Sequence, residues 1–358
     1  MKNREIQGLR GLCVLMVFFS HSFGIIPFVI RIGNIDLSIS PFRSLWDGQI
    51  AVVIFFILSG YFSYATFFNI NGTSFFKKYI NFIIKRMLRL YPIYILVMAI
   101  GFIMSNINIT YEYTSFSEWF NSFWRNKVTI IEFLKQVFPI ISFNSKAINP
   151  PIWTLQVEFR YLLIMPLFFI FIKRYNSIFS LTIIALLSYS LGIFNLLYIF
   201  AIGMIIKKEE DKITKVFYEK NIYNKIFLVF ISILLLGFQY NFHYIASKMN
   251  TNNIMFIVSI GGSILMLLIL SLLKNGIKIS FLNNVFMVGL GNISYSFYLW
   301  HFIVLLSIRP LYKFINNYFI YIALAFFITL FLSFITEKIN YFCIIKIKET
   351  NLERNIKI

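Results

Sequence analysis

Long apolar stretches alternate along the chain with short polar segments, and most of these stretches have about the length that crosses a lipid bilayer. A helix needs about 20 predominantly apolar residues to span the hydrocarbon core. We therefore predict ten spanning segments, at about residues 6–29, 47–69, 90–107, 152–172, 177–191, 193–206, 223–242, 254–273, 285–308 and 314–336. The fifth and sixth are short and could form one broken or re-entrant element. The pattern predicts an all-α polytopic membrane protein, a bundle of about ten transmembrane helices.

Composition argues against a soluble protein. Hydrophobic residues make up 59% of the 358 residues, charged residues only 13%, and the mean hydropathy is +0.77. A soluble domain of this length has too little interior to bury so much apolar surface. The two cysteines, Cys13 and Cys343, lie near opposite ends of the chain and indicate neither a disulfide framework nor a metal site.

The distribution of basic residues predicts the orientation. If both termini are cytoplasmic, the cytoplasmic segments hold 23 of the 33 Lys and Arg residues and the outer segments hold nine. This excess is the positive-inside pattern. The net charge of +19 then reflects topology and attraction to anionic lipid, not binding of nucleic acid. We predict one integral-membrane domain over residues 1–345, with an outer loop at about 108–151, and a short polar cytoplasmic tail at 346–358.

Arg10 and His21 are eleven positions apart in the first predicted span. Because a helix turns about 100° per residue, their side chains share one face, roughly 16 Å apart along the axis. With the N-terminus inside, Arg10 lies about one turn from the cytoplasm and His21 lies in the outer half of the membrane. Ionisable residues at such depth are costly and are functional by default.

Further charged residues lie at both ends of the predicted bundle. Arg86 and Arg89 are three residues apart and share a helix face at the cytoplasmic mouth of the third span. Guanidinium groups suit phosphate better than ammonium groups do. In the fourth span, which enters from outside, Glu158 lies at about the depth of His21, and Arg160 follows it.

Small and polar residues extend this polar stripe onto two other spans. Ser59 and Gly60 in the second span allow the close approach of a neighbouring helix or a ligand. In the ninth span, Ser294, Tyr298 and His301 are spaced so that they can form one polar face.

The separation of charges implies a chemistry. A cationic vestibule at the inner side suits a polyanionic cofactor that arrives from the cytoplasm. An imidazole near a carboxylate in the outer half suits general-base catalysis on a hydroxyl group. A carboxylate hydrogen-bonded to one ring nitrogen of His21 would fix the tautomer and raise the basicity of the other nitrogen. The sequence contains no serine nucleophile elbow, phosphate-binding loop or metal cluster, so we predict no metal.

At these residues the chain resembles the acyltransferase-3 family of bacterial integral-membrane O-acyltransferases, in the stand-alone form that lacks the secreted esterase-like domain of some members. Five blocks carry the resemblance, in the order LRGLCVLMVFFSH, GQIAVVIFFILSGYF, RMLRLYP, IWTLQVEFRYLLIMP and GNISYSFYLWHF. The first holds the family's Arg and His, and the third its R-x-x-R motif. The fourth is close to the pattern W-[ST]-L-x-V-E, and the last is close to S-Y-x-x-Y-L-W-H. The blocks are spread over nearly the whole chain.

The resemblance implies transfer of an acyl group, usually acetyl from acetyl-CoA, to a carbohydrate hydroxyl on or beyond the outer face. It implies a catalytic role for His21, with Glu158 in support. It also implies that the acyl donor is bound by Arg10, Arg86 and Arg89.

Two positions depart from the family pattern. Members often carry an acidic residue where this chain has Gln49 or Ala51, and many carry a second acidic residue where it has Phe159. The second departure leaves open whether Glu158 is the only carboxylate at work in the fourth span.

The principal candidates also have a structural explanation. His21 could be a packed bundle histidine that is satisfied by a neighbouring helix. Arg86 and Arg89 could be ordinary positive-inside anchors, which is the explanation we favour for Lys77 and Lys78.

Four further residues are candidates for substrate binding or support, namely Arg160, Tyr298, His301 and Ser59. Arg160 could instead pair with Glu158 and make the fourth span tolerable in lipid. Tyr298 and His301 suit the outer interface of a bundle, where aromatic and imidazole side chains are common, and we favour a structural role for both.

The sequence thus predicts a multi-pass O-acyltransferase of the bacterial cytoplasmic membrane. It would load acetyl-CoA or another acyl-CoA from the cytoplasm and acylate a cell-surface or lipid-linked glycan, such as an O-antigen, capsule or exopolysaccharide. Its partners would be that acceptor and membrane lipid, and not nucleic acid. Two alternatives remain: a transporter or flippase for a lipid-linked sugar, and a structural subunit of a polysaccharide export complex.

Overall fold

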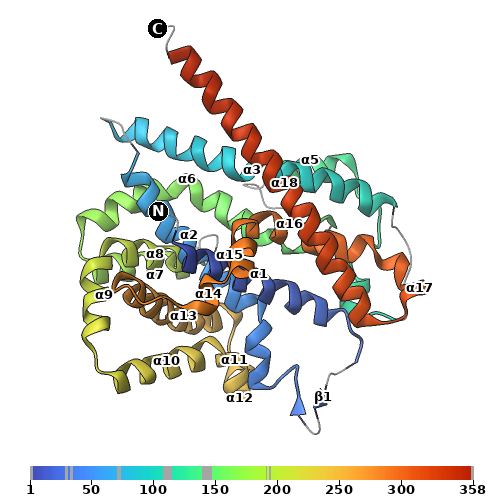
Figure 1. The fold of residues 1–358 in the computed structure, drawn as a ribbon, viewed down its shortest axis with the longest axis horizontal. Helices are drawn as coiled ribbons and strands as arrows, with labels where there is room; N and C mark the ends of the chain where they lie inside the picture. Colours follow the sequence, from blue (N-terminus) through green and yellow to red (C-terminus); the bar gives the residue numbers. More distant parts are fainter. Residues whose placement is uncertain are drawn as a thin grey trace.

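The computed structural model describes residues 3–28, 31–32, 35–70, 74–107, 115–138, 147–190, 192 and 195–355. Within these ranges the chain is almost wholly helical (Figure 1). The exception is a two-residue antiparallel pair of strands, β1 (Arg31–Ile32) and β2 (Ile35–Asp36).

Six helical segments of the described chain are long and apolar enough to cross a membrane. They are α1 (Arg4–Gly24), α2 (Gly48–Phe68), α3 (Phe75–Ile107), the 3₁₀ turn η3 (Pro150–Ile152) with α6 (Trp153–Arg174), α13 (Thr251–Lys274) and α18 (Tyr318–Asn355). A seventh candidate is broken, because α15 (Val285–Asn292) and α16 (Ser294–Ser307) meet at an angle of 79°. The protein is therefore a multi-pass integral membrane protein.

Shorter helices lie between these segments. Three of them are apolar helices of 14, 12 and 15 residues, α7 (Ser177–Ser190), α8 (Leu197–Lys208) and α10 (Ile222–Leu236). The others are η1 (Pro41–Trp46), α4 (Glu118–Asn121), α5 (Ile130–Val137), α9 (Glu210–Glu219), α11 (Phe238–Asn241), α12 (His243–Ala246), α14 (Ser280–Asn283), η5 (Arg309–Leu311) and α17 (Tyr312–Ile315).

The helical polytopic class predicted from the sequence is confirmed, and each of the ten predicted ranges contains a helix. The helices in the fifth, sixth and seventh ranges are shorter than the roughly 20 residues of a lone spanning helix. The number of crossings, the cytoplasmic termini and the domain boundary at residue 345 stay predictions. The predicted outer loop is described only at residues 115–138 and from residue 147 onward.

The bend between α15 and α16 departs from the straight ninth span that the hydropathy pattern predicted. Gly289, Gly291 and Asn292 are weak helix formers, and they precede the break at Ile293. The hydroxyl of Ser294 donates to the carbonyl of Gly291, 2.9 Å away, which satisfies one carbonyl at the end of α15. Hydropathy alone does not distinguish a bent apolar segment from a straight one.

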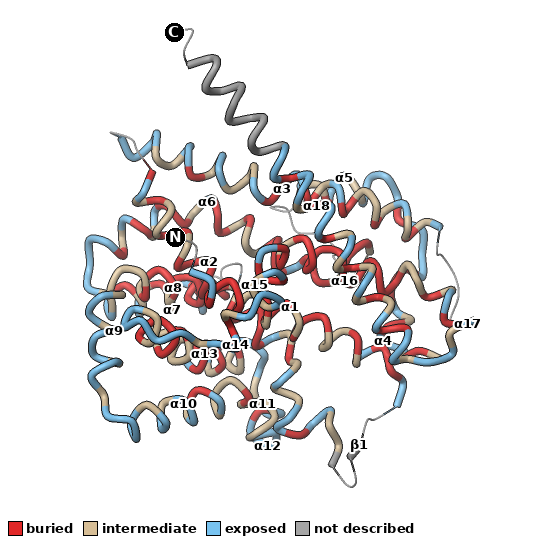
Figure 2. The backbone as a smooth tube through the Cα atoms, viewed as in Figure 1, coloured by how far each residue is buried: buried red, intermediate tan, exposed pale blue. Residues whose placement is uncertain are grey.

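Of the helices that carry candidate residues, α1, α2 and α16 lie toward the centre of the molecule, whereas α3 runs along its upper edge in Figure 1. α1 packs along α15 and α2, and α2 packs along α8. Buried positions are concentrated on these helices and on α16, whereas α9 and α10 are largely exposed (Figure 2). Ionisable side chains of α1 and α16 also meet in this part of the molecule.

Glycines permit the close approach of α1 to α15. A Cβ atom at Gly291 would lie 1.8 Å from the backbone oxygen of Gln7, and one at Gly11 would lie 2.1 Å from that of Met287. Both distances are far below contact distance, so only glycine fits at this crossing. Gly289, on the same helix, has open space around its Cβ position.

We expect Gly291→Ala to destabilise the protein and Gly289→Ala to be tolerated. The first change forces α15 away from α1, and overpacking of this kind costs about 1–3 kcal/mol or more. The second places alanine, a better helix former, into free space. Thermal unfolding of the two variants in detergent measures the difference. Equal unfolding midpoints would contradict this account of the crossing.

Part of the predicted outer loop folds back onto the end of α1. The backbone N–H of Ser117 donates to the carbonyl of Ile25 at 2.9 Å, and its hydroxyl donates to the carbonyl of Gly24 at 2.7 Å. The indole N–H of Trp124 donates to the carbonyl of Ile148 at 2.9 Å. These bonds hold α4 beside the C-terminal turn of α1, next to His21.

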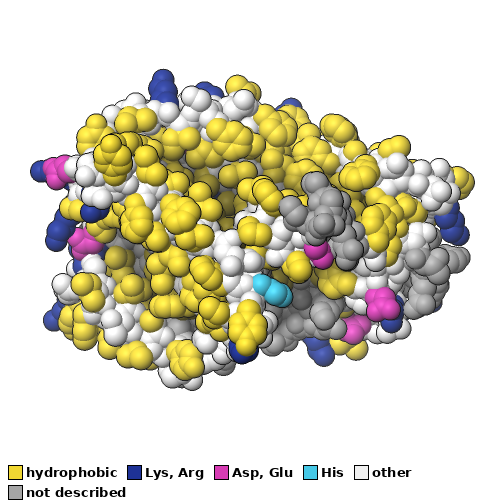
Figure 3. Space-filling view, turned by 90° about the horizontal axis from the view of Figure 1, so that it is seen from below, with side chains coloured by type: hydrophobic (Ala, Val, Ile, Leu, Met, Phe, Trp, Pro, Cys, Tyr) yellow, Lys and Arg dark blue, Asp and Glu magenta, His cyan; other side chains and the backbone are white. Residues whose placement is uncertain are grey.

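The surface agrees with a lipid environment. On the face drawn in Figure 3, hydrophobic side chains form broad patches and charged side chains lie mostly toward the edges. Large apolar side chains on several helices are more than half exposed, including Phe227 on α10 and Phe327 and Phe331 on α18. Exposed apolar area of this extent marks contact with lipid or another apolar partner.

Candidate active site

Two adjoining cavities contain most of the candidate residues. The first, which we call the arginine cavity, has a volume of about 110 Å³ and lies among α1, α2, α3, α6 and α16. Its polar and charged lining consists of Arg10, Ser59, Arg86, Arg89, Thr154, Glu158, Ser294, Tyr295 and Tyr298. Phenylalanines of α2 form much of the remaining wall. The cavity is thus a cationic site with aromatic walls.

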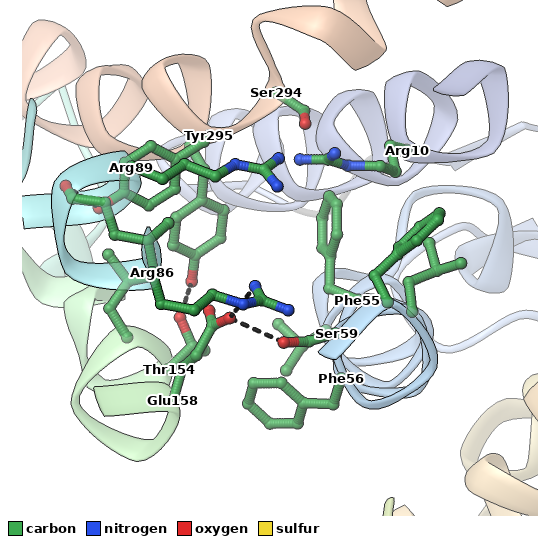
Figure 4. Close-up of a pocket in the computed structure, with 16 residues that line it drawn as sticks. Arg10, Phe55, Phe56, Ser59, Arg86, Arg89, Thr154, Glu158, Ser294 and Tyr295 are labelled. Atoms are coloured by element: carbon green, nitrogen blue, oxygen red, sulfur yellow. Dashed lines mark hydrogen bonds and ion pairs between the residues drawn. The ribbon is translucent and has the colours of Figure 1, made fainter. Parts of the chain in front are cut away.

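Arg86 and Glu158 form an ion pair across this cavity. The guanidinium of Arg86 lies 3.9 Å from the Oε1 atom of Glu158, and the side chains are 11% and 19% exposed. The hydroxyl of Ser59 donates to the same oxygen at 2.7 Å, and Arg86 also donates to the hydroxyl of Ser63. Figure 4 shows Ser59, Arg86 and Glu158 converging from α2, α3 and α6. Arg86 is therefore held in place by groups of the protein itself.

The surroundings of Arg10 and Arg89 differ from those of Arg86. Their guanidinium groups point toward each other below Ser294 (Figure 4). In the part of the chain that the structure describes, neither guanidinium forms an ion pair or a hydrogen bond with the protein. Two like charges that face each other in a partly enclosed site repel. This arrangement is suited to an anion that binds between them and neutralises both.

One carboxylate near this cluster could not be recognised from the sequence. Glu337 of α18 accepts a hydrogen bond of 2.6 Å from the hydroxyl of Ser296, and its charge acts on Arg10. The residue directly follows the last predicted span, so it looked like an ordinary polar end of a helix. Only the packing of α18 against α16 brings it toward the arginines.

The second cavity, which we call the histidine cavity, is larger, at about 590 Å³. It is lined by residues that include His21, Arg43, Asp47, Gln49, Trp153, Gln239, Tyr240 and His243. Asp47 shapes its wall, because its carboxylate caps α2 at the amide of Gln49 and accepts a hydrogen bond of 2.5 Å from the hydroxyl of Tyr240. The cavity thus has polar groups and aromatic rings at fixed positions.

His21 is half-buried and is surrounded by rings. Its Nδ1 atom lies 3.0 Å from the Nε2 atom of His301 on α16. Trp119 of α4 stacks parallel to the imidazole, with ring centroids 6.1 Å apart, and Phe302 meets it edge-on at 5.1 Å. His301 itself is fully buried, and its Nδ1 atom lies 2.7 Å from the carbonyl oxygen of Tyr298.

The predicted pairing of His21 with Glu158 is wrong. The carboxylate bonds to Ser59 and Arg86 in the arginine cavity, and the partner of His21 is another histidine, His301. The sequence gives the depth of a residue along its helix but not the direction in which the neighbouring helix lies. Moreover, the predicted third span began at residue 90, whereas α3 begins at Phe75 and carries Arg86 inside the helix.

The four supporting candidates have different surroundings. Ser59 contacts Glu158, and His301 contacts His21. The hydroxyl of Tyr298 lies 2.8 Å from both the carbonyl of Pro151 and the hydroxyl of Thr154, and the residue lines both cavities. Arg160 lines neither cavity, and it is not the ion-pair partner of Glu158.

Val52 and Tyr298 line both cavities, so the two spaces adjoin at these side chains. Neither the three arginines nor Glu158 lines the histidine cavity, and His21 does not line the arginine cavity. The cation cluster and the imidazole are therefore in separate compartments with a common wall. Val52 is an ordinary apolar residue of α2, and nothing in the sequence indicates that it lies between two cavities.

The position after Glu158 is part of the packed core. Phe159 is 2% exposed, and its ring lies 5.6 Å from that of Tyr94. Glu158 is thus the only carboxylate that α6 contributes. Among the described residues, no group of three His, Cys, Asp or Glu side chains is placed to hold a metal ion.

A buried cation cluster and an imidazole in adjoining compartments of a multi-pass helical bundle suit a membrane-embedded enzyme with an anionic co-substrate. The chain matches the family model of an acyltransferase domain over residues 3–338. Because this match covers nearly the whole chain, the protein belongs to the acyltransferase-3 family and is an acyltransferase. Neither the search of curated proteins nor that of solved structures gave a match.

Proposed function

We propose that the protein transfers an acetyl group from cytoplasmic acetyl-CoA to a hydroxyl group of a cell-surface or lipid-linked glycan, at the outer face of the bacterial cytoplasmic membrane. The observation that carries this proposal is the pair of adjoining cavities, one cationic and one holding His21, which share Val52 and Tyr298. Such a pair offers guanidinium groups to a phosphate-bearing donor on one side of the wall and space for a hydroxyl acceptor on the other.

The arginine cavity suits the donor. Coenzyme A is a polyanion, and its phosphates match the guanidinium groups of Arg10, Arg86 and Arg89. Arg86 is already oriented by Glu158, whereas Arg10 and Arg89 are left for the ligand. In this arrangement Glu158 positions an arginine and does not assist the base. The pantetheine arm would then extend along the aromatic wall toward the shared side chains.

The histidine cavity suits the acceptor. Its volume of about 590 Å³ accommodates one or more sugar units, and its aromatic and amide side chains offer stacking and hydrogen bonds to them. His21 would take the proton from an acceptor hydroxyl as the oxygen attacks the thioester carbon. The new C–O bond forms while the C–S bond breaks, and the imidazolium then returns its proton to the departing thiolate. The products are an O-acetyl ester and free coenzyme A.

The test is acetyl transfer by the protein in membrane vesicles. Vesicles with and without the protein are given acetyl-CoA labelled in the acetyl group, together with the polysaccharide fraction of the strain that carries the protein. We expect label in the polysaccharide and an equal amount of free thiol, only with the protein present. Movement of saccharide across the vesicle membrane without any acyl donor, and no label transferred, would instead support a transporter.

A further inference from the structure

We propose that His301 is a positioning residue that fixes the tautomer of His21, so that the Nε2 atom of His21 is the basic nitrogen. This inference rests on the proposed function, in which His21 is the general base. It assigns to a second histidine the orienting task that a carboxylate performs in many catalytic groups. The sequence analysis favoured a structural role for His301, and the geometry gives it a more specific one.

The first step is the tautomer of His301 itself. Its Nδ1 atom lies 2.7 Å from the carbonyl oxygen of Tyr298, and a carbonyl oxygen can only accept a hydrogen bond. Nδ1 of His301 therefore carries the proton. In a neutral imidazole the other ring nitrogen, Nε2, is then an acceptor. Full burial keeps this ring neutral, because an imidazolium without a counter-charge is costly to bury.

The protonation of His301 determines which ring nitrogen of His21 on α1 carries a proton. Nε2 of His301 lies 3.0 Å from Nδ1 of His21, so an acceptor on His301 requires a donor on His21. Nδ1 of His21 therefore carries the proton and Nε2 holds the lone pair. Since His21 lines the histidine cavity, a hydroxyl bound there would have an unprotonated ring nitrogen of His21 available as the base. The reversed tautomer would place two lone pairs against each other between the rings.

The third step is the charge that develops during the reaction. When His21 takes the proton, its Nδ1–H becomes a stronger donor, and the hydrogen bond to His301 is then charge-assisted. The parallel face of Trp119 and the edge of Phe302 cover the ring on other sides. Arg43 lines the same cavity as His21, and its positive charge opposes a second one there. His301 is thus a side chain that can accept a hydrogen bond from the imidazolium directly.

The segment that bears His301 is held rigidly. The side-chain amide of Asn149 donates to the carbonyl of Leu299 at 2.9 Å, and the hydroxyl of Tyr298 donates to the carbonyl of Pro151 at 2.8 Å. These bonds tie the middle of α16 to η3 and the residue before it. A positioning group must itself be fixed to hold its partner within a few tenths of an ångström. His301 meets that requirement.

Two amide substitutions separate this role from simple packing. In His301→Gln the amide oxygen reaches the place of Nε2 and can accept from Nδ1–H of His21. In His301→Asn the shorter amide reaches only the place of Nδ1, so it can bond to Tyr298 but leaves His21 without its acceptor. The two variants keep similar polarity and are assayed for turnover, for KM and for thermal stability in the vesicle assay with labelled acetyl-CoA.

We expect His301→Asn to lower kcat roughly 10- to 100-fold, by analogy with the loss found when the hydrogen-bond partner of a metal-ligating histidine is removed. The KM for acetyl-CoA should not change, because His301 does not line the arginine cavity. His301→Gln should restore kcat to within a few-fold of the original protein. Equal activity of the two variants, or equal loss at unchanged thermal stability, would overturn the proposal. An inactive starting protein would instead refute the proposed function.

A measurement on the unsubstituted protein covers the case in which a variant fails to fold. The chain has only three histidines, so nitrogen-15 NMR of histidine-labelled protein can resolve each ring, with His243→Gln used to assign the third. The proposal requires that the protonated nitrogen of His21 is Nδ1. A His21 ring protonated at Nε2 in the resting protein would overturn it.

Discussion

His21→Ala is expected to lower acetyl transfer by roughly 10²- to 10⁴-fold, the contribution that a positioned general base makes to a rate. The loss should fall on kcat, since the donor would bind in the arginine cavity, which His21 does not line. Binding of labelled acetyl-CoA by the variant should therefore be close to that of the unsubstituted protein. Parallel assays of transfer and of donor binding in the same vesicles measure both quantities.

Phe19→Leu is the matched control for this substitution. Phe19 is on α1 two residues before His21, and its ring packs on Phe18 and Phe23 outside both cavities. Replacing one apolar side chain by another of similar size should leave both transfer and binding nearly unchanged. If His21→Ala transfers acetyl groups as fast as this control, His21 is a packed bundle histidine and the proposed mechanism is wrong.

Arg10→Gln is expected to raise the KM for acetyl-CoA roughly 10- to 100-fold. Hydrogen bonds to charged groups contribute about 1.5–3 kcal/mol, and each 1.4 kcal/mol corresponds to a factor of ten in affinity. The turnover at saturating donor should change less, because Arg10 lies away from the imidazole. Initial rates over a range of acetyl-CoA concentrations measure the two parameters separately.

The thermal stability of Arg10→Gln provides a second readout for this substitution. In the ligand-free protein the guanidinium of Arg10 faces that of Arg89, so removing one charge relieves a repulsion. Arg10→Gln should therefore be at least as stable to heat as the original protein. Lys78→Gln removes the same charge from α3, outside both cavities, and should leave the KM unchanged. A KM that is equally insensitive to both substitutions would show that Arg10 does not bind the donor.

Much of the fold could be predicted because it follows from local patterns. Apolar length predicted where helices lie, and each predicted range does contain one. The register of Arg10 and His21 was also predictable, since both residues belong to one continuous helix, α1. Properties that arise within a single helix thus follow from its own sequence.

Properties that depend on two helices could not be predicted in the same way. Glu158 was predicted beside His21 but lies with Arg86 in the arginine cavity, because the partner of a side chain depends on how its helix packs. The contact between His21 and His301 joins residues 280 positions apart. Trp119 and Glu337 reach the site only through the folded segment at 115–138 and through α18, and neither belongs to a motif that indicates such a position.

The central claim is that donor and acceptor occupy different compartments and that the acetyl group passes between them. The most direct measurement uses sealed vesicles with the protein in one orientation, labelled acetyl-CoA only on the side of the arginine cavity, and the polysaccharide acceptor only on the other side. The account predicts labelled polysaccharide on the side that never contained acetyl-CoA, and none when His21 is replaced by alanine. Label that appears only when donor and acceptor share one side would contradict it.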